Sequence, residues 1–372
     1  MLKNITKKKS YNILGVMSGT SMDGIDISII KTNGTNYVRV INEKSYGYSL
    51  ALQNKIKKII KNKQLNNNTI IKYYKQNEDL INKVYIFFIR KFLNEFKINK
   101  DKIDFISLSG QTVYHNPLKK ITIQLGSGRV IANNFKIKTI CDFRKNDIKY
   151  KGQGAPIGSY YHRFILNKFD NKSIIVNLGG IANFTAINKR IVISSDIGPA
   201  NCLIDDLTNY FFNKKFDKNG ILSSKGTINS KILNLFKNDI FFKQKFPKSL
   251  DRNYFDKYKN KLKNINKYDA LCTATYMTLV GFQKFLKFYK FNFNNIILTG
   301  GGRKNTYLLN ILKNNINKKI TLIDNLNING DLVEAQMFAY IGIRSIKKLT
   351  ISGKNTTGAI KNISGGKIYF PN

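Results

Sequence analysis

The sequence is poor in residues that form covalent or metal-held scaffolds. It has no tryptophan, five prolines, three cysteines and two histidines. Cys141, Cys202 and Cys272 lie far apart, which excludes a disulfide framework and a cysteine-based zinc site and is typical of a reducing cytoplasm. His115 and His162 show no metal-ligand spacing, so we expect no zinc site.

Long apolar segments are missing as well. No run of 18 apolar residues occurs, so the sequence predicts no membrane-spanning helix. A polar turn, rather than an apolar segment, follows the basic stretch at residues 1–10, and we therefore expect no secretory signal. Hydrophobic residues make up 42% of the chain and charged residues 23%, as in globular proteins. We expect a globular protein of the cytoplasm.

Acidic residues are scarce beside basic ones. The chain has 63 lysines and arginines against 22 acidic residues, a formal net charge of +41, and nine of the basic residues are arginine. Such a charge is compatible with nucleic-acid binding. The lysines, however, are spread over the whole chain, and arginine is the better reader of bases and phosphates. A solvated basic surface that attracts anionic ligands is favoured, with no specific nucleic-acid partner and no membrane partner.

The length of 372 residues predicts about two domains. Two parts of the chain begin alike, with an apolar strand, a tip of small residues and a second apolar strand, followed by further strands and helices. We therefore predict an α/β fold with one domain over residues 1–150 and a second over 151–334. A C-terminal helix within 335–372 is expected to return to the first domain. A ligand would bind in a cleft between the two, where strand-end loops face each other.

The tip of the first hairpin, residues 18–24, combines glycine, serine, threonine and aspartate. Glycine lets backbone N–H groups approach an anion, and hydroxyl groups add donors. Asp23 offers an oxygen ligand that could hold Mg²⁺ through water. An ordinary hairpin turn explains the same composition equally well. The spacing matches neither a Walker A loop nor a dinucleotide-binding fingerprint.

Three segments in the second half are further candidates. Gly179 and Gly180 form the matching hairpin tip. A plain tight turn is an equal alternative, but the two tips together could hold a triphosphate. The glycines at 300–302 follow an apolar strand and would permit contact with a planar ring such as adenine, although a flexible turn is an equal alternative. Asp196 follows a strand and precedes a predicted helix, where it could act as a general base or cap the helix.

The first half and the C-terminal helix contain residues suited to a sugar. Gln111 and Thr112 follow one predicted strand and offer hydrogen bonds. Arg144 follows another strand and could pair with a carboxylate. Glu334 lies early in a predicted helix, where the helix dipole alone would also favour an acid.

Taken together, these segments resemble the anhydro-N-acetylmuramic acid kinase family, within the superfamily of sugar kinases, heat-shock chaperones and actin-like ATPases. Each segment is modest alone, but their ordered set from about residue 13 to 371 is specific. The matching segments are 15–26, 110–117, 142–144, 152–156, 177–183, 196–201, 300–302, 334–339 and 357–359.

The resemblance implies two actin-like ATPase (ribonuclease H-like) domains flanking a central cleft. It also implies a kinase of peptidoglycan recycling that converts 1,6-anhydro-N-acetylmuramic acid, ATP and water to N-acetylmuramic acid 6-phosphate and ADP. Asp196 would be the general base that activates water, and Asp23 would lie next to Mg²⁺. A homodimer is common among such enzymes, and we expect one here.

The resemblance also implies which residues bind each substrate. Those near ATP would be Gly19, Thr20, Ser21, Met22, Asp23, Gly24, Ile25, Asp26, Gly179, Gly180, Gly300, Gly301 and Gly302. Those near the sugar or the metal shell would be Gln111, Thr112, Arg144 and Glu334.

Some loop residues depart from the family's pattern, among them Ser127, Lys151, Ala200 and Lys304. We expect these to change loop geometry more than reaction type. Three other functions stay open: a related sugar kinase with a different acceptor, a basic nucleic-acid-binding protein on the same fold, and an ATP-binding sensor without catalysis. The presence of Asp23 and Asp196 argues against the sensor.

Overall fold

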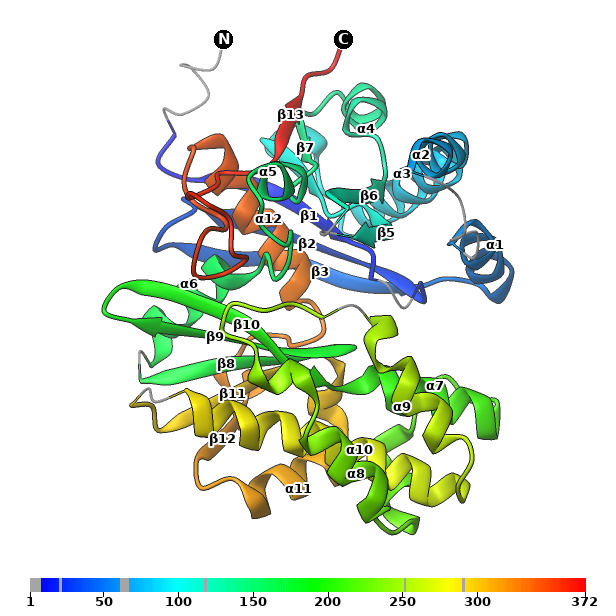
Figure 1. Cartoon of the computed structure of the whole chain (residues 1–372). Helices are drawn as coiled ribbons and strands as arrows, with labels where there is room; N and C mark the ends of the chain where they lie inside the picture. The colour runs from blue at the N-terminus through cyan, green and yellow to red at the C-terminus, as the bar shows by residue number, and fades with distance from the viewer. Residues whose placement is uncertain are drawn as a thin grey trace. The chain divides into compact units, whose positions relative to one another are not determined.

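The chain divides into two compact units. Figure 1 shows its computed structural model, which describes residues 8–19, 22–60, 67–116, 119–170, 172–250, 252–289 and 292–372. Unit 1 comprises Met1–Phe164 and Leu332–Asn372, and unit 2 comprises Ile165–Asp331. The division falls inside helix α6 (Ser159–Phe169) and not at residue 150 as predicted. The reason is that the first turn of α6 packs within unit 1, where the Tyr161 hydroxyl donates to Gln336.

Unit 1 is built on a six-stranded sheet with the order β13-β7-β4-β1-β2-β3. Its strands are β1 (Tyr11–Met17), β2 (Gly24–Thr32), β3 (Val38–Gly47), β4 (Phe105–Leu108), β7 (Thr139–Cys141) and β13 (Lys367–Tyr369). β1 pairs antiparallel with β2 and parallel with β4, β2 pairs antiparallel with β3, and β4 pairs parallel with β7. The central strand β1 is apolar because neighbours cover it on every side, and Ile13, Leu14 and Val16 are fully buried.

The C-terminal helix α12 (Val333–Ile346) belongs to unit 1 and packs on β1 and β2 (Figure 1). The close approach depends on Gly15 of β1. A Cβ atom at Gly15 would lie 2.1 Å from the carbonyl oxygen of Ala335 and 2.8 Å from the Cβ atom of Ala339. Small residues on both elements therefore bring the start of α12, which contains Glu334, close to the end of β1.

The remaining elements of unit 1 include a small two-stranded sheet and several helices. They are α1 (Leu50–Ile60), α2 (Asn67–Gln76), α3 (Glu78–Glu95), η2 (Lys100–Lys102), β5 (Gln111–Asn116), β6 (Ile121–Leu125), α4 (Gly128–Phe135) and α5 (Lys145–Lys149). Helix α3 buries Ile81, Tyr85, Phe88 and Phe92, which recur every three to four residues and form one apolar face.

Unit 2 contains a five-stranded sheet with the order β10-β9-β8-β11-β12. Its strands are β8 (Ser173–Leu178), β9 (Ile181–Asn188), β10 (Ile191–Pro199), β11 (Asn295–Thr299) and β12 (Lys319–Leu322). Its α-helices are α7 (Asn201–Phe212), α8 (Ser230–Lys237), α9 (Asp256–Leu262), α10 (Lys267–Phe288) and α11 (Thr306–Asn315). Six short 3-10 helices join them: η3 (Lys218–Gly220), η4 (Ser223–Lys225), η5 (Ile240–Lys243), η6 (Arg252–Phe255), η7 (Gly301–Lys304) and η8 (Ile323–Leu326).

The two sheets share one topology. In unit 2, β8 pairs antiparallel with β9 and parallel with β11, β9 pairs antiparallel with β10, and β11 pairs parallel with β12. The order β3-β2-β1-β4-β7 of unit 1 repeats this arrangement strand for strand. Each unit therefore has the ribonuclease H-like strand order of an actin-like ATPase domain, which confirms the predicted fold class at the level of the individual domains.

The sequence did not reveal every strand. β3 is an edge strand with largely exposed or half-buried residues, and its Arg39, Glu43 and Lys44 interrupt any apolar alternation. Over the ranges that the structure describes, no helix combines the length and the apolar character needed to cross a membrane.

Candidate functional site

The tip of the β1–β2 hairpin in unit 1 is held by the chain that follows β4. The Ser18 N–H donates to the hydroxyl of Ser109 at 3.2 Å, and the Ser18 hydroxyl contacts that of Tyr85 at 2.6 Å. The side-chain amide of Gln111 donates to the carbonyl oxygen of Gly19 at 3.0 Å. A hydrogen bond in unit 1 thus joins Gly19, which was predicted to lie near the phosphates, to Gln111, which was predicted to lie near the sugar.

The residues predicted for the tip differ in what they can offer a ligand. The side chain of Ile25 is fully buried in the core, so only its main chain can face a ligand. Met22 adopts a φ of 56° and packs partly against the same core. Asp23 is exposed, and its carbonyl oxygen accepts from the Tyr48 N–H at 2.8 Å. Thr20 and Ser21 lie outside the described residues.

Gly24 and Asp26 continue the tip into β2. A Cβ atom at Gly24 would lie 2.6 Å from the carbonyl oxygen of Tyr46, so the pairing of β2 with β3 leaves room only for glycine. Asp26 pairs in register with Met17 and is half-buried. Together, Asp23 and Asp26 place two carboxylates at one end of this hairpin.

A second polar group of unit 1 contains Arg144 and Glu334. Burial lowers the pKa of Arg144, and the negative charges of Glu334 and Asp147 oppose that effect. The guanidinium group also donates to the carbonyl oxygen of Gly154 at 2.7 Å. Burial and the nearby Arg144 lower the pKa of His115 to about 4, so His115 is neutral at pH 7. Arg144 therefore lies close enough to Glu334 and to His115 to interact electrostatically with each of them.

The strand β5 begins with Gln111 and Thr112, and Thr112 pairs with Gln124 of β6. The Gln111 side chain is 1% exposed, and its Oε1 atom has no hydrogen-bond partner in the described part of the chain. A buried acceptor without a partner is costly unless a ligand or water completes it. A hydroxyl or amide group of a ligand is one kind of partner that could complete this oxygen.

The loop that contacts Arg144 is organised by Asp147, which the sequence analysis did not single out. Its carboxylate is fully buried and accepts from the Gly154 N–H at 2.7 Å and from the hydroxyls of Ser352 and Thr357 at 2.5 Å each. A Cβ atom at Gly152 would lie 2.0 Å from Asp147 Oδ2. The Gly-rich segment at 152–156 is therefore wrapped around one buried carboxylate.

In unit 2, the tip of the β8–β9 hairpin lies against the start of α7. The Asn201 side-chain amide donates to the carbonyl oxygens of Leu178 and Gly179, both at 2.9 Å. The Asn201 N–H donates to Gly179 at 3.0 Å, and the Cys202 N–H donates to Gly180 at 3.1 Å. The predicted phosphate tip is thus fixed by several hydrogen bonds.

The glycines at 300–302 pack on this same tip. A Cβ atom at Gly302 would lie 2.8 Å from that of Leu178 and 3.0 Å from Asn201 Oδ1. Arg303 holds the turn, because its guanidinium group donates to the Gly300 carbonyl oxygen at 3.1 Å and pairs with Asp324 at 2.6 Å and Asp331 at 2.9 Å. Unit 2 therefore joins Gly179, Gly180 and the glycine turn into one continuous surface.

Two neighbouring glycines of this turn give a matched stability test. Gly300 has a φ of 79°, and its Cβ atom would lie 2.3 Å from Asn177 Oδ1, whereas a Cβ atom at Gly301 meets nothing closer than 4.0 Å. We expect Gly300→Ala to lower the free energy of unfolding by about 2–4 kcal/mol and the melting temperature by several degrees. Gly301→Ala should leave both within error. Equal melting temperatures in calorimetry would contradict this packing.

Asp196 lies inside β10 and not at its end, which corrects the predicted placement at the start of a helix. β10 continues to Pro199, with a register shift between Asp196 and Gly198, and the residue that caps α7 is Ala200. The Asp196 carboxylate accepts instead from the Leu250 N–H at 2.7 Å. Capping of the helix by Asp196 is therefore wrong.

The environment of Asp196 makes it a base near neutral pH. Its side chain is buried, at 6% exposure, and burial raises its pKa to about 7 while the Leu250 N–H and the Ser249 hydroxyl counteract the rise. A carboxylate of this kind retains enough basicity to remove a proton from water, unlike an exposed carboxylate. The geometry thus fits general-base chemistry.

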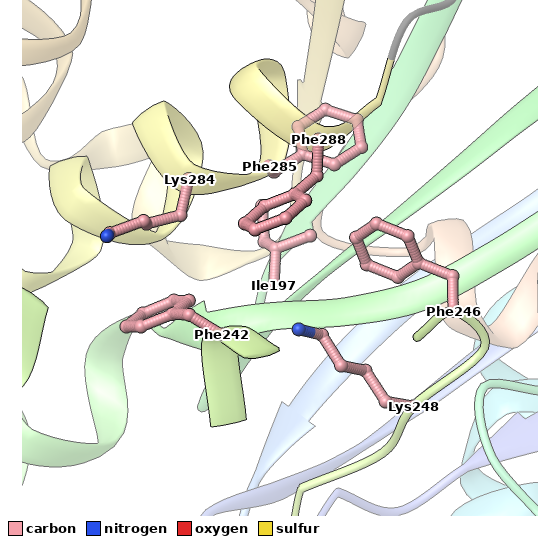
Figure 2. A pocket seen from close by; sticks show the side chains of 7 residues that line it. All are labelled: Ile197, Phe242, Phe246, Lys248, Lys284, Phe285 and Phe288. Carbon is pink, nitrogen blue, oxygen red and sulfur yellow. The ribbon is translucent and has the colours of Figure 1, made fainter. Parts of the chain in front are cut away.

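Residues 246–250 pair with β10 at Asp196, and no signal in the sequence singled them out. The Lys248 carbonyl oxygen accepts from the Asp196 N–H and from the Ser195 hydroxyl, both at 2.9 Å. Figure 2 shows the Lys248 side chain directed toward phenylalanine rings, and its ammonium group donates to the Phe241 carbonyl oxygen at 2.7 Å. Burial lowers the pKa of Lys248 to about 8.

The residues that depart from the family's pattern have local roles. Lys151 has a φ of 64°, a conformation that favours the glycine expected there. Ser127 caps α4 by accepting from the Val130 N–H, and Lys304 forms an ion pair with Asp331 at 2.5 Å. Ala200 is fully buried at the start of α7. None of these residues changes the surroundings of Asp196 described above.

A resident metal cluster is not evident in the described ranges, where no group of three or more histidine, cysteine or acidic side chains comes together. The hairpin tip offers only the carboxylates of Asp23 and Asp26. Few protein ligands are what Mg²⁺ needs when it is bound mainly through water and substrate phosphates. These two residues therefore fit a nucleotide-borne Mg²⁺ better than a permanently bound ion.

Known proteins match this chain over nearly its whole length, including both units. The model of the anhydro-N-acetylmuramic acid kinase family matches residues 11–371. An anhydro-N-acetylmuramic acid kinase of Zymomonas mobilis is 32% identical, with 96% of this chain and 99% of that protein covered. The protein of the same name from Pelagibacter ubique is 35% identical, with 96% and 98% covered. Among solved structures, the activator of 2-hydroxyisocaproyl-CoA dehydratase from Clostridium difficile is 11% identical at a TM-score of 0.46, with 91% and 96% covered. On the family match and the identities of these relatives, the chain belongs to the anhydro-N-acetylmuramic acid kinase family.

Proposed function

We propose that this protein opens the anhydro ring of 1,6-anhydro-N-acetylmuramic acid with water and phosphorylates the freed O6 atom with ATP. The products are N-acetylmuramic acid 6-phosphate and ADP. The observation that carries the proposal is the buried Asp196 with a pKa of about 7, on a strand beside the glycine-rich tip of unit 2. Such a base can take a proton from water, as ring opening requires, or from the free hydroxyl of an ordinary sugar acceptor, and the family match over residues 11–371 favours the anhydro sugar.

The residues of unit 2 would serve the water and the nucleotide. Asp196 takes a proton from water, and the water oxygen bonds to the anomeric carbon while the bond from that carbon to O6 breaks. Gly179 and Gly180 present main-chain N–H groups to phosphate oxygens, and the open face of Gly301 leaves room for adenine.

The residues of unit 1 would serve the phosphates and the sugar. The main chain at Gly19, Met22 and Gly24 would line the phosphates, and Asp23 would hold Mg²⁺ through water, which neutralises phosphate charge when bound. Gln111 Oε1 and the Thr112 hydroxyl would bind polar groups of the sugar. Arg144 would pair with its carboxylate, and Glu334 would fix the orientation of the guanidinium group or of a sugar hydroxyl.

The steps balance without a further reagent. O6 keeps the electron pair of the broken carbon–oxygen bond and attacks the γ-phosphorus atom of ATP. The bond from that phosphorus to ADP breaks, and the proton held by Asp196 passes to solvent. Each turnover therefore consumes one water and one ATP and releases one proton, and catalysis rests on positioning and charge neutralisation.

The rate should depend on the ionisation of Asp196. Since the base must be deprotonated, we expect kcat to rise with pH through an apparent pKa near 7 and then to level off. The sign for stability is the opposite: a folded-state pKa above the unfolded value means that ionised Asp196 costs stability increasingly from about pH 4 to pH 7. A kcat profile that is flat from pH 5.5 to 8.5 would contradict the role of Asp196.

The experiment that tests the proposal identifies the product. The protein is incubated with Mg-ATP and, in separate reactions, 1,6-anhydro-N-acetylmuramic acid, N-acetylmuramic acid, N-acetylglucosamine and glucose. We expect a 6-phosphate only, or at least 100-fold faster, from the anhydro sugar. Faster turnover of an acceptor with a free 6-hydroxyl would indicate a related sugar kinase and overturn the proposal.

The cellular compartment and the assembly state of the protein belong to the same proposal. We propose that the protein works in the cytoplasm on the muramic acid fragments of peptidoglycan, as a homodimer and without a nucleic-acid partner. Sedimentation at micromolar concentration tests the dimer, and nucleic-acid binding measured at 150 mM salt tests the absence of such a partner.

A further inference from the structure

Gly154 lies between a buried carboxylate and the guanidinium group of Arg144. Its N–H donates to Asp147 Oδ2 at 2.7 Å, and its carbonyl oxygen accepts from Arg144 Nη1 at 2.7 Å. Gly154 has a φ of 68°, and a Cβ atom there would lie 3.1 Å from side-chain atoms of His115 and Ile148. One tightly packed glycine therefore connects Asp147 to Arg144 through its own main chain.

The other carboxylate oxygen of Asp147 is bound by the C-terminal part of unit 1. The hydroxyls of Ser352 and Thr357 both donate to Asp147 Oδ1 at 2.5 Å, and all three side chains are buried. The Thr357 carbonyl oxygen accepts from the Gln153 N–H at 2.8 Å, one residue before Gly154. Asp147 therefore ties two loops of unit 1 together, and its full burial keeps the carboxylate from touching a ligand itself.

We propose that Asp147 is a positioning residue for Arg144, because it holds the Gly154 carbonyl oxygen at the place where that oxygen binds the guanidinium group. The bond to Gly154 uses one of the five N–H donors of the guanidinium group, and a carboxylate needs two. Arg144 thus remains able to bind a carboxylate while it is held. The inference rests on the proposed function for its kinetic consequence, since Arg144 is there assigned to the carboxylate of the sugar.

Removing the carboxylate should weaken binding of the sugar and leave the chemical step largely intact. In Asp147→Ala the Gly154 N–H loses its acceptor, so the loop no longer fixes the guanidinium group. We expect KM for 1,6-anhydro-N-acetylmuramic acid to rise about tenfold, with kcat within about threefold and KM for ATP within about twofold of the wild type. A merely structural role would lower the amount of folded enzyme, and hence kcat, at an unchanged KM.

A milder pair of variants serves if Asp147→Ala does not fold. Thr357→Val removes the hydroxyl that donates to Asp147 at nearly the same side-chain volume, and Thr357→Ser retains it. We expect the sugar KM to rise about threefold in Thr357→Val and to stay at the wild-type value in Thr357→Ser. Asp104→Ala is the matched control in unit 1: Asp104 also accepts a main-chain N–H, that of Asn12 at 2.9 Å, but at the end of β1 opposite the hairpin tip. Its sugar KM should not change.

A measurement without substrate separates this inference from the proposed function. The arginine side chains are labelled with ¹⁵N, and the Arg144 signals are assigned by their absence in Arg144→Lys. Restricted rotation of the guanidinium group gives separate NMR signals for its two Nη atoms, and we expect these signals to merge in Asp147→Ala. Such merging supports the inference even if the wild type proves inactive on the anhydro sugar. Signals that behave as in the wild type in folded Asp147→Ala or Thr357→Val, or an unchanged sugar KM in the active enzyme, would overturn it.

Discussion

Replacing Asp196 with asparagine is expected to lower kcat by about three orders of magnitude. A general base contributes roughly 10²- to 10⁴-fold, and within the described residues the Leu250 N–H that binds Asp196 has no second carboxylate as acceptor. The amide group of asparagine cannot accept a proton from water, and its nitrogen would face the Leu250 N–H unless the group turns over. Product formation by Asp196→Asn should therefore be slow over the whole range from pH 6 to 9.

The same variant should remain folded, which separates chemistry from stability. Ionised Asp196 is buried, and the rise of its pKa from 3.8 to about 7 corresponds to a cost of about 4 kcal/mol at high pH. Asp196→Asn removes that charge, so its melting temperature above pH 7 should equal or exceed that of the wild type, and its affinity for ADP should be unchanged. A variant with kcat within tenfold of the wild type would show that Asp196 is not the base.

Replacing Asp23 with asparagine is expected to lower kcat by about two orders of magnitude and to raise the Mg²⁺ concentration needed for half-maximal rate. The side chain is exposed at the hairpin tip, and the Asp23 carbonyl oxygen accepts from the Tyr48 N–H. Asparagine has the same size as aspartate and keeps this main-chain contact, so the substitution chiefly removes one negative charge. Metal ions and oriented charges account for several kcal/mol of phosphoryl-transfer catalysis.

Asp79 provides the matched control for Asp23. It is an exposed aspartate of unit 1 whose ion pair with Lys83, at 2.7 Å, lies on the surface of α3 and contributes little to stability. Asp79→Asn should keep the wild-type kcat and Mg²⁺ dependence. If Asp23→Asn behaved in the same way as Asp79→Asn, the assignment of Asp23 to the metal would be wrong.

Much of the fold was predictable because its signals are local. The structure contains the two predicted hairpins, β1–β2 and β8–β9, in which apolar strands flank a tip of small residues. The glycines at 300–302 follow a strand as expected, and packing explains why: Gly300 and Gly302 touch the neighbouring tip. The match of both sheets to one strand order then follows from two chain segments with the same succession of elements.

The missed residues acquire their meaning only through distant pairing. Asp147 lies between Lys145 and Lys149 in a short helix and resembles a surface charge, yet its partners Ser352 and Thr357 come from the other end of the chain. Lys248 lies in a segment without helical or strand periodicity, and its main chain pairs with Ser195 and Asp196 of β10, more than 50 residues earlier. No spacing rule within a single sequence reveals such pairs.

For Asp196, the sequence suggested a role but did not reveal the position within β10. The family resemblance implied a base at this position, whereas the local sequence alone favoured a helix cap somewhat more, because the strand was expected to end before it. β10 continues past this residue through a register shift between Asp196 and Gly198, and the Asp196 carboxylate accepts from the Leu250 N–H instead of capping a helix. A bulge of this kind is a tertiary feature, and its local sequence resembles an ordinary turn.

The measurement that tests the central claim most directly follows the oxygen of water. The protein, Mg-ATP and 1,6-anhydro-N-acetylmuramic acid are mixed in H₂¹⁸O and quenched within one half-time, with unlabelled N-acetylmuramic acid 6-phosphate in H₂¹⁸O as the exchange control. Mass spectrometry should find one ¹⁸O atom at the anomeric carbon of the product and none in its phosphate group, and the labelled product should be lost in Asp196→Asn. ADP formation with an unlabelled sugar, or with ¹⁸O in inorganic phosphate instead, would contradict the account.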